Sequence, residues 1–318
     1  MKILKILCHL EVDRMLYGAL GEQLKIFRTQ DYTYWIEDHQ LGVPVTRDID
    51  SIVNNDWDIV IVDDTRTWSD ITKLKIKAKA FVWYVHGSYH TWQGFQSFAN
   101  ERLKDYNFIF TDESRLNYWK SWYKNNFNKY ITLPIHLQDF YFTPELPITR
   151  NGAVYSIGSE LLKSSALYGN SAMSTIIALS ILGLDRYHIY GYGNKKIPIN
   201  KRHIKSFSEN IRNSLNGYSA SAHPSEVQTL GFALLESMAA GVPVICTPKI
   251  DFVKYRFKDG DAPFLITNTP QEFYQYAKKF LKSQAYCDLV AYNARKFLRE
   301  NYPFENYKQK INDWLLSL

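Results

Sequence analysis

The segment Ser221–Thr247 constrains the fold of this chain more than any other part of its sequence. It predicts a strand that ends at His223, a loop through Gly231, a helix and a second strand. Gly241 favours a left-handed cap at the end of the helix, and Pro243 prevents the helix from continuing. The apolar face of the helix consists of Leu234, Leu235, Met238 and Ala239, and the second strand contains Val242, Val244 and Ile245. The segment therefore predicts a βαβ crossover.

The junction between the first strand and the helix is suited to binding an anion. A glycine-containing loop that leads into a helix presents unpaired backbone N–H groups and the positive end of the helix dipole. Glu236 lies farther along the helix, where its carboxylate can accept hydrogen bonds from hydroxyl groups. A diphosphate attached to a ribose would satisfy both features.

The same segment resembles the signature of retaining glycosyltransferases of family 4 and their relatives with the GT-B fold. The matching residues are Pro224-Ser225 and the run Glu-Ser-Met-Ala-Ala-Gly-Val-Pro-Val-Ile over 236–245. In that family the second of two glutamates holds the nucleotide ribose, so the resemblance implies this role for Glu236. Gln228 replaces the first glutamate, which keeps a carbonyl acceptor for a sugar hydroxyl but removes the charge. The loop amides that hold the diphosphate and the sugar correspond to Thr229, Leu230 and Gly231.

Three further segments extend the resemblance. A strand that ends in His86-Gly87 resembles the family's strand-end histidine, whose imidazole faces the donor sugar, although a histidine there can also simply cap a loop. The strand Ala153–Gly158 leads into a loop where relatives place an Arg and, about four residues later, a Lys to neutralise the diphosphate. Lys163 fits this pattern, and Ser159 replaces the Arg. Gly191 belongs to a Gly-x-Gly that resembles the turn under the nucleobase.

Alternating strands and helices predict an α/β chain with parallel sheets, and 318 residues favour two domains. The polar, proline-containing stretch 143–151 is the expected linker. The resemblance implies two Rossmann-like domains that face each other across a cleft. The expected parts are an acceptor-side domain over 1–147, a nucleotide-sugar-binding domain over 151–302 and a final helix over 303–318 that packs back on the first domain. A capping box, Thr269 with Glu272, predicts another helix as far as about Leu281.

Composition narrows the function classes. Residues 1–150 carry 18 basic and 19 acidic side chains, whereas the remainder carries 20 and 13, so the positive charge lies in the half with the anion site. The first strand, expected over Ile3–Leu10, is not followed by a glycine-rich fingerprint, which argues against a dinucleotide oxidoreductase. The sequence shows no metal-ligand spacing, no long apolar span and no paired cysteines. We therefore expect a cytoplasmic enzyme without a cofactor or metal.

These observations predict a retaining glycosyltransferase that moves a hexose from a UDP-sugar such as UDP-glucose, with His86, Lys163 and Gln228 at the reacting sugar. The acceptor stays open among a glycan, a lipid, a protein and, as in viral glucosyltransferases, hydroxymethylated DNA. A non-catalytic nucleotide-sugar-binding protein and an epimerase are the alternatives. The oligomeric state is open.

Two surface hypotheses accompany this prediction. The aromatic and basic segment 115–129, which includes Trp119, favours a helix in the protein core but is also compatible with a peripheral contact at the inner face of a membrane. A run of alternating lysines favours a solvent-facing sheet edge over a DNA contact. This run consists of Lys73, Lys75, Lys77 and Lys79.

Overall fold

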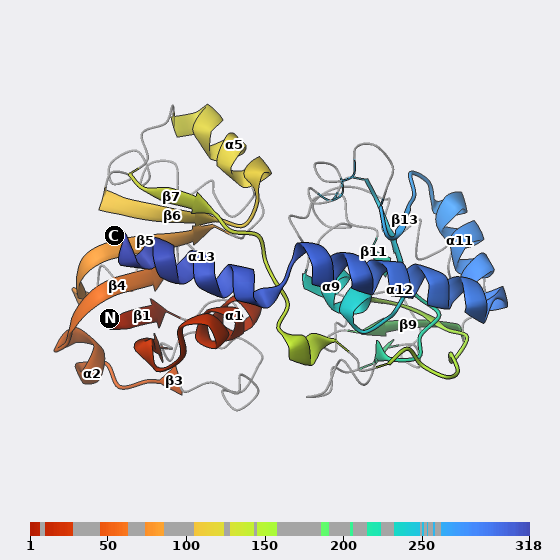
Figure 1. The fold of residues 1–318 in the computed structure, drawn as a ribbon, viewed down its shortest axis with the longest axis horizontal. Helices are drawn as coiled ribbons and strands as arrows, with labels where there is room; N and C mark the ends of the chain where they lie inside the picture. The colour runs from red at the N-terminus through yellow and green to blue at the C-terminus, as the bar shows by residue number, and fades with distance from the viewer. Residues whose placement is uncertain are drawn as a thin grey trace. The chain divides into compact units, whose positions relative to one another are not determined.

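A computed structural model describes residues 1–6, 10–27, 45–62, 74–85, 105–123, 128–142, 145–157, 186–190, 204–205, 215–223, 232–248, 250, 253, 257 and 262–318. The chain divides into two compact units (Figure 1). The first unit comprises Met1–His136 and Phe304–Leu318, and the second comprises Leu137–Pro303.

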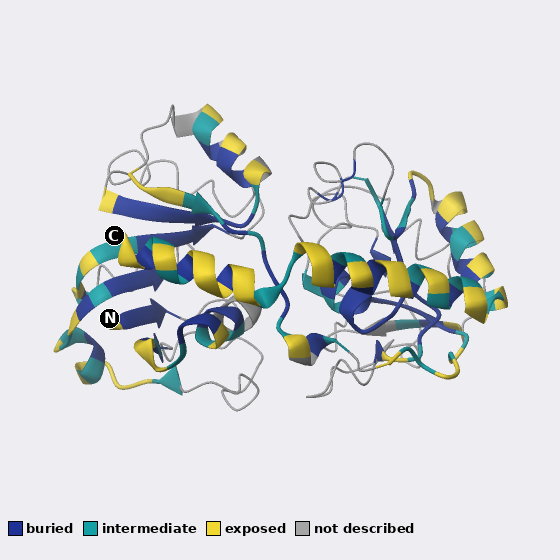
Figure 2. Ribbon diagram, in the orientation of Figure 1, coloured by how far each residue is buried: buried dark blue, intermediate teal, exposed yellow. Residues whose placement is uncertain are grey.

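The first unit is built on a parallel sheet in the order β3-β2-β1-β4-β5-β6-β7. Its strands are β1 (Ile3–Ile6), β2 (Leu24–Phe27), β3 (Val45–Thr46), β4 (Asp56–Val62), β5 (Lys77–Val85), β6 (Tyr106–Phe110) and β7 (Tyr130–Thr132). Every residue of β1 and β6 is buried, as expected of strands covered on both faces (Figure 2). The strand expected over Ile3–Leu10 is shorter in the structure, because Leu10 already belongs to a helix.

The helices that the structure describes in the first unit cover this sheet. They are α1 (Leu10–Leu20), α2 (Asp50–Val53), α5 (Glu113–Tyr123) and α13 (Phe304–Leu316), together with the 3₁₀ turn η1 (Gly21–Gln23). The last helix of the chain packs beside α1, where Asn312 Nδ2 donates to Ala19 O at 3.1 Å. On the sheet side, Tyr307 of α13 is buried and its hydroxyl lies 3.4 Å from that of Tyr84.

Trp119 of α5 belongs to the core of the first unit. Its side chain is 2% exposed and its ring lies 5.5 Å from Phe108 and 6.0 Å from Phe110. The core interpretation of this residue is therefore confirmed. The side chains of Trp122 and Tyr123 lie outside the described part of the chain.

The expectation that the alternating lysines face solvent is confirmed for Lys77 and Lys79, but the expectation of an edge strand is wrong. Strand β5 pairs with β4 on one side and with β6 on the other. Lys77 and Lys79 are exposed, and they precede Phe81, where pairing with β6 begins. Lys79 Nζ bonds Asp58 Oδ1 of β4 at 2.6 Å, and this hydrogen bond lowers the pKa of the Asp58 carboxyl.

The second unit contains a second parallel sheet in the order β10-β9-β8-β11-β12-β13. Its strands are β8 (Val154–Ile157), β9 (Tyr187–Tyr190), β10 (Ile204–Lys205), β11 (Ala220–His223), β12 (Val244–Cys246) and β13 (Leu265–Ile266). The described helices are α9 (Phe232–Ala239), α11 (Pro270–Lys282) and α12 (Gln284–Asn301), with a 3₁₀ turn η5 (Asp139–Tyr141). When the strands of each sheet are numbered along the chain, their spatial order begins 3-2-1-4 in both sheets. This is the strand order of a Rossmann sheet.

Helix α11 begins as its sequence predicts. Thr269 Oγ1 accepts a hydrogen bond from Glu272 N at 3.2 Å, while the Glu272 carboxylate accepts one from Thr269 N at 3.2 Å. Both halves of the capping box are therefore present, and Pro270 occupies the first turn.

Candidate functional site

The order of the second sheet identifies where a ligand would bind. From β8 the chain continues to β9 on one side, whereas from β11 it continues to β12 on the other. The strands are parallel, so their carboxyl ends meet at one edge, and the crevice outside such a reversal point is the usual ligand site of open α/β sheets. Strand β8 ends here at Ile157 and β11 ends at His223. We take this edge, together with the start of α9, as the candidate site.

Most site residues expected from the sequence follow the ends of described strands. Gly158 comes directly after β8, Gly191 comes directly after β9, and His86 comes directly after β5 of the first unit. These three residues lie outside the described part of the chain, as do Ser159, Lys163, Gln228, Thr229, Leu230 and Gly231. The described framework therefore places the strand ends from which these segments start, and the roles of the residues themselves stay predictions.

Glu236 is the one predicted site residue that the structure describes. It lies in α9 between the buried Leu235 and Ser237, and its side chain is partly exposed. The apolar face of the helix is buried as predicted, since Leu234 and Met238 are both fully inaccessible. The periodicity of α9 thus directs its apolar residues into the core and leaves Glu236 partly exposed.

The end of α9 has the predicted glycine cap. Gly241 has φ 73, its N–H donates to Met238 O at 3.1 Å, and Val242 N donates to Ser237 O at 2.9 Å. These two bonds form a Schellman motif. Val242 was expected in the following strand, but it serves the cap instead, and β12 begins at Val244.

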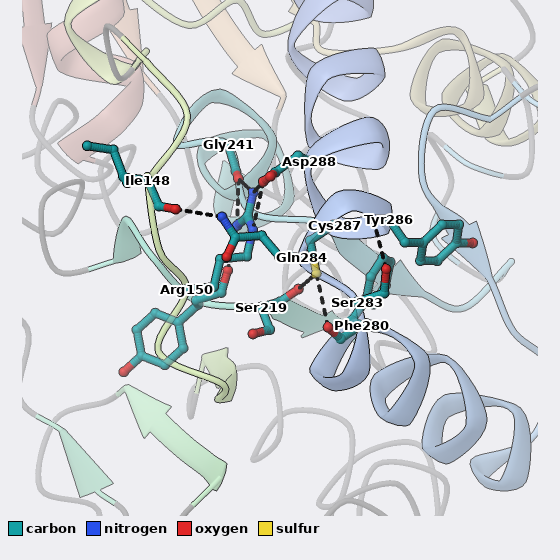
Figure 3. Close-up of polar contacts among 11 residues, drawn as sticks. Ile148, Arg150, Ser219, Gly241, Phe280, Ser283, Gln284, Tyr286, Cys287 and Asp288 are labelled. Atoms are coloured by element: carbon teal, nitrogen blue, oxygen red, sulfur yellow. Dashed lines mark hydrogen bonds and ion pairs between the residues drawn. The ribbon is translucent and has the colours of Figure 1, made fainter.

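Arg150 connects this cap to the linker and to α12 (Figure 3). Its buried guanidinium donates to Gly241 O at 3.2 Å, to Tyr218 O at 2.8 Å and to Asp288 Oδ1 at 2.7 Å. A cation at the carboxyl end of a helix is also favoured by the helix dipole. Nearby, Gln284 Nε2 donates to Ile148 O at 2.6 Å. The linker is therefore fixed to the same framework that holds α9.

A buried polar network beneath α9 was not predicted. Ser237 Oγ donates to Ala233 O at 2.7 Å and is hydrogen-bonded to the hydroxyl of Tyr155 in β8. His223 Nε2 lies 3.3 Å from Ser237 Oγ and 3.3 Å from Ser221 Oγ. The available sequence signal was the presence of Ser221, His223 and Ser237 at otherwise apolar, buried positions.

Two other ionisable groups next to this framework are held neutral. Burial raises the pKa of the Tyr187 phenol and of the Cys246 thiol far above their ordinary values. Both side chains are inaccessible or nearly so. Neither group can therefore act as an anionic base or nucleophile near neutral pH.

Comparison with protein families gives a match over the second unit. Residues 193–297, a range that includes α9 and Glu236, match the family model of glycosyl transferases group 1. None of the curated protein sequences compared matches the chain.

Solved structures match the chain over its full length. Anabaena HepE, determined in complex with UDP-glucose, has a TM-score of 0.73 at 12% identity, with 100% of each chain covered. The fold is that of the GT-B glycosyltransferases. Sucrose-phosphate synthase from Thermosynechococcus elongatus has a TM-score of 0.68 at 11% identity and covers 100% of this chain and 99% of its own. WaaG, a glycosyltransferase involved in lipopolysaccharide biosynthesis, has a TM-score of 0.64 at 11% identity, with coverages of 98% and 99%.

The GT-B resemblance inferred from the sequence motifs is thus confirmed for the fold, and the family model supports it over residues 193–297. Within the described ranges, no group of three His, Cys, Asp or Glu side chains is arranged to hold a metal ion. Of the helices that the structure describes, none is both long and apolar enough to cross a membrane.

Proposed function

We propose that this protein is a retaining glycosyltransferase that transfers a hexose from a UDP-sugar, such as UDP-glucose, to an acceptor hydroxyl. The proposal rests on the βαβ unit β11–α9–β12 at the reversal point of the second sheet, with Glu236 partly exposed on α9. The family match over 193–297 includes this unit, and HepE of the same fold was determined with UDP-glucose.

The proposed donor site combines the start of α9 with the loops that follow β8 and β11. Backbone N–H groups of Thr229, Leu230 and Gly231, aided by the helix dipole, bind the diphosphate. The Glu236 carboxylate accepts hydrogen bonds from the ribose hydroxyls. Gly158, Ser159 and Gly191 complete the nucleotide site, and Lys163 supplies positive charge to the phosphates.

The proposed chemistry is transfer from the front face of the sugar. The bond between the anomeric carbon and the diphosphate breaks, the acceptor oxygen bonds to the same face, and the leaving diphosphate takes the acceptor proton. Lys163 and the loop amides stabilise the charge that develops on the diphosphate. His86 and Gln228 contact the transferred sugar. This route requires no protein nucleophile and no metal.

A donor panel tests the proposal. Calorimetry with UDP, GDP, ADP and their glucose conjugates should show selective binding of UDP and UDP-glucose. Glu236→Gln should weaken UDP by about tenfold, because it removes a charged acceptor from the ribose. The matched control, Glu300→Gln on the exposed surface of α12, should leave affinity unchanged. Binding of every nucleotide with the same affinity, or of none, would refute the nucleotide-sugar assignment.

Activity then separates the enzyme from a non-catalytic binder, which the replacements Gln228 and Ser159 favour as the second candidate. Slow hydrolysis of UDP-glucose without acceptor, lost in Lys163→Ala, would support the enzyme. An NMR assay of the released sugar in the first minutes should show the α-anomer if transfer is retaining, and chelation by EDTA should leave the rate unchanged if no metal takes part. Release of free sugar also distinguishes transfer from epimerisation.

The acceptor requires its own screen. Glycan, lipid and protein acceptors come first, with hydroxymethylated DNA as the alternative. Transfer of labelled glucose onto one class only would define the substrate.

A further inference from the structure

The segment 224–231, which contains the predicted diphosphate loop, joins two described elements. Strand β11 ends at His223 and helix α9 begins at Phe232. A side-chain link connects the two. His223 Nε2 lies 3.3 Å from Ser237 Oγ, and the same oxygen is bonded to Ala233 O in the first turn of α9 at 2.7 Å. A side-chain contact therefore joins the last residue of β11 to the body of α9.

The direction of these hydrogen bonds follows from counting protons. The Ser237 hydroxyl donates to Ala233 O, and the Ser221 hydroxyl donates to Pro243 O at 3.4 Å. Because both hydroxyl protons are used, His223 Nε2 must carry the proton that is shared with the two serine oxygens. The hydroxyl of Tyr155 likewise donates to Ser237 Oγ. Ser237 thus connects β8, β11 and α9 through one oxygen.

The side chains of this network are buried, so none of them can contact a ligand at the protein surface. Tyr155, Ser221, His223 and Ser237 are all 0% exposed. Buried polar groups add little net stability over apolar side chains of similar shape, but once fully bonded they allow only one arrangement. The principal consequence of this network is therefore geometric.

We propose that His223 and Ser237 are positioning residues that hold α9 against the end of β11, and so fix the Glu236 carboxylate relative to the strand end from which the predicted diphosphate loop starts. The proposal rests on the proposed function, since it assigns a role at that same donor site. Glu236 is the direct neighbour of Ser237 in α9, whereas Thr229–Gly231 lie between the two linked ends. A nucleoside diphosphate must reach both groups at once, but a nucleoside reaches only the ribose side.

This difference gives a test that general damage to the fold cannot mimic. UDP binding is measured by calorimetry and uridine binding by ligand-observed NMR, for the full chain and its variants. Ser237→Ala should weaken UDP by about fivefold, the effect of one net hydrogen bond, and leave uridine unchanged. Ser237→Thr, which keeps the hydroxyl, should restore UDP affinity. His223→Leu breaks the same link from β11 and should produce the same selective loss even if Ser237→Ala does not fold.

Cys287→Ala is the matched control. Cys287 is fully buried in α12 and its thiol bonds Ser219 O and Phe280 O at 3.4 and 3.2 Å, so its loss lowers stability without touching the link (Figure 3). This variant should leave the affinities of both ligands unchanged. Equal loss of uridine and UDP affinity in Ser237→Ala and His223→Leu, or no loss in either, would overturn the positioning role while wild-type UDP binding still supports the proposed function. Absence of UDP binding by the wild type would overturn both.

Discussion

The two sheets begin with the same strand order but bury different side chains. Strands β5 and β6 of the first sheet bury large aromatic side chains. These are Trp83, Phe108 and Phe110, each at most 1% exposed. Strands β8 and β11 of the second sheet bury Ala222, Ser156, Ser221 and His223. Small side chains on β11 leave room for a helix to approach, and the polar ones bond it. The shared topology creates a potential site at one edge of each sheet, whereas side-chain size and polarity decide how a helix is held there.

The largest expected effect tests the aromatic core of the first unit. Trp119→Ala should lower the free energy of unfolding by about 3–5 kcal/mol, because it leaves a large cavity against Phe108 and Phe110. Urea unfolding followed by circular dichroism measures the loss. Tyr292→Ala is the control, since Tyr292 is 58% exposed and its removal should change stability by less than about 0.5 kcal/mol. Similar values for both variants would contradict the assignment of Trp119 to the core.

The next effect tests the polar framework of the second unit. Arg150→Met should cost about 3 kcal/mol, because it leaves the carbonyls of Tyr218 and Gly241 and the carboxylate of Asp288 without their buried donor. The Asp288 side chain is 32% exposed, so water compensates part of the loss. Lys296→Met, which removes an exposed ion pair with Glu300 on the same helix, should cost less than about 0.5 kcal/mol. If Arg150→Met lowered the free energy of unfolding no more than Lys296→Met does, the guanidinium would not contribute to the stability of the second unit.

A buried histidine gives the first unit a predicted pH dependence. Burial lowers the pKa of His136 to about 4, against an opposing hydrogen bond to Pro134 O at 2.6 Å. In the unfolded chain the imidazole takes up its proton near pH 6.5. Between pH 6.5 and about 4 the unfolded state therefore binds more protons, so stability should fall as the pH decreases through this window.

The expected loss from His136 is about 2–3 kcal/mol, and this group should contribute no further loss below its folded pKa. Urea titrations at pH 7.5, 6, 5 and 4 measure the slope. His136→Gln should be less stable than the wild type at pH 7.5 but should lose less on acidification. An unchanged slope in the variant would assign the pH dependence to other groups.

Much of the fold could be predicted from local sequence patterns. The helix periodicity around Leu234, the left-handed Gly241 and the capping box at Thr269 each depend on neighbouring residues, and the structure contains all three. The sequence predictions failed at positions whose structure is determined by hydrogen-bonding partners elsewhere in the chain. The position of β5 inside the sheet depends on its pairing with β4 and β6, and the place of Val242 depends on its bond to Ser237. Alternation and propensity do not contain this information.

The βαβ framework of the candidate site was predictable from the sequence, but the polar contacts that support it were not. The motif around Glu236 located the helix that borders the site, and family resemblance supplied the expected roles of Lys163 and Gln228. The network of Tyr155, His223 and Ser237 joins residues from three separate elements. Only the packed structure shows that their polar atoms meet, because no spacing rule connects β8 to α9.

The smallest expected effect returns to the second unit, at the start of α11. Thr269→Ala should cost about 1 kcal/mol, because Glu272 N loses its side-chain acceptor while Glu272 still accepts from Asn268 N at 2.6 Å. Thr269→Ser keeps the hydroxyl and should restore most of the loss, which separates the cap from simple packing of the methyl group. Gln275→Ala, at an exposed position in the same helix, should be neutral or slightly stabilising. If Thr269→Ser were as destabilising as Thr269→Ala, the hydroxyl cap would contribute nothing, and the start of α11 would depend on the packing of Phe273 in the core of the second unit.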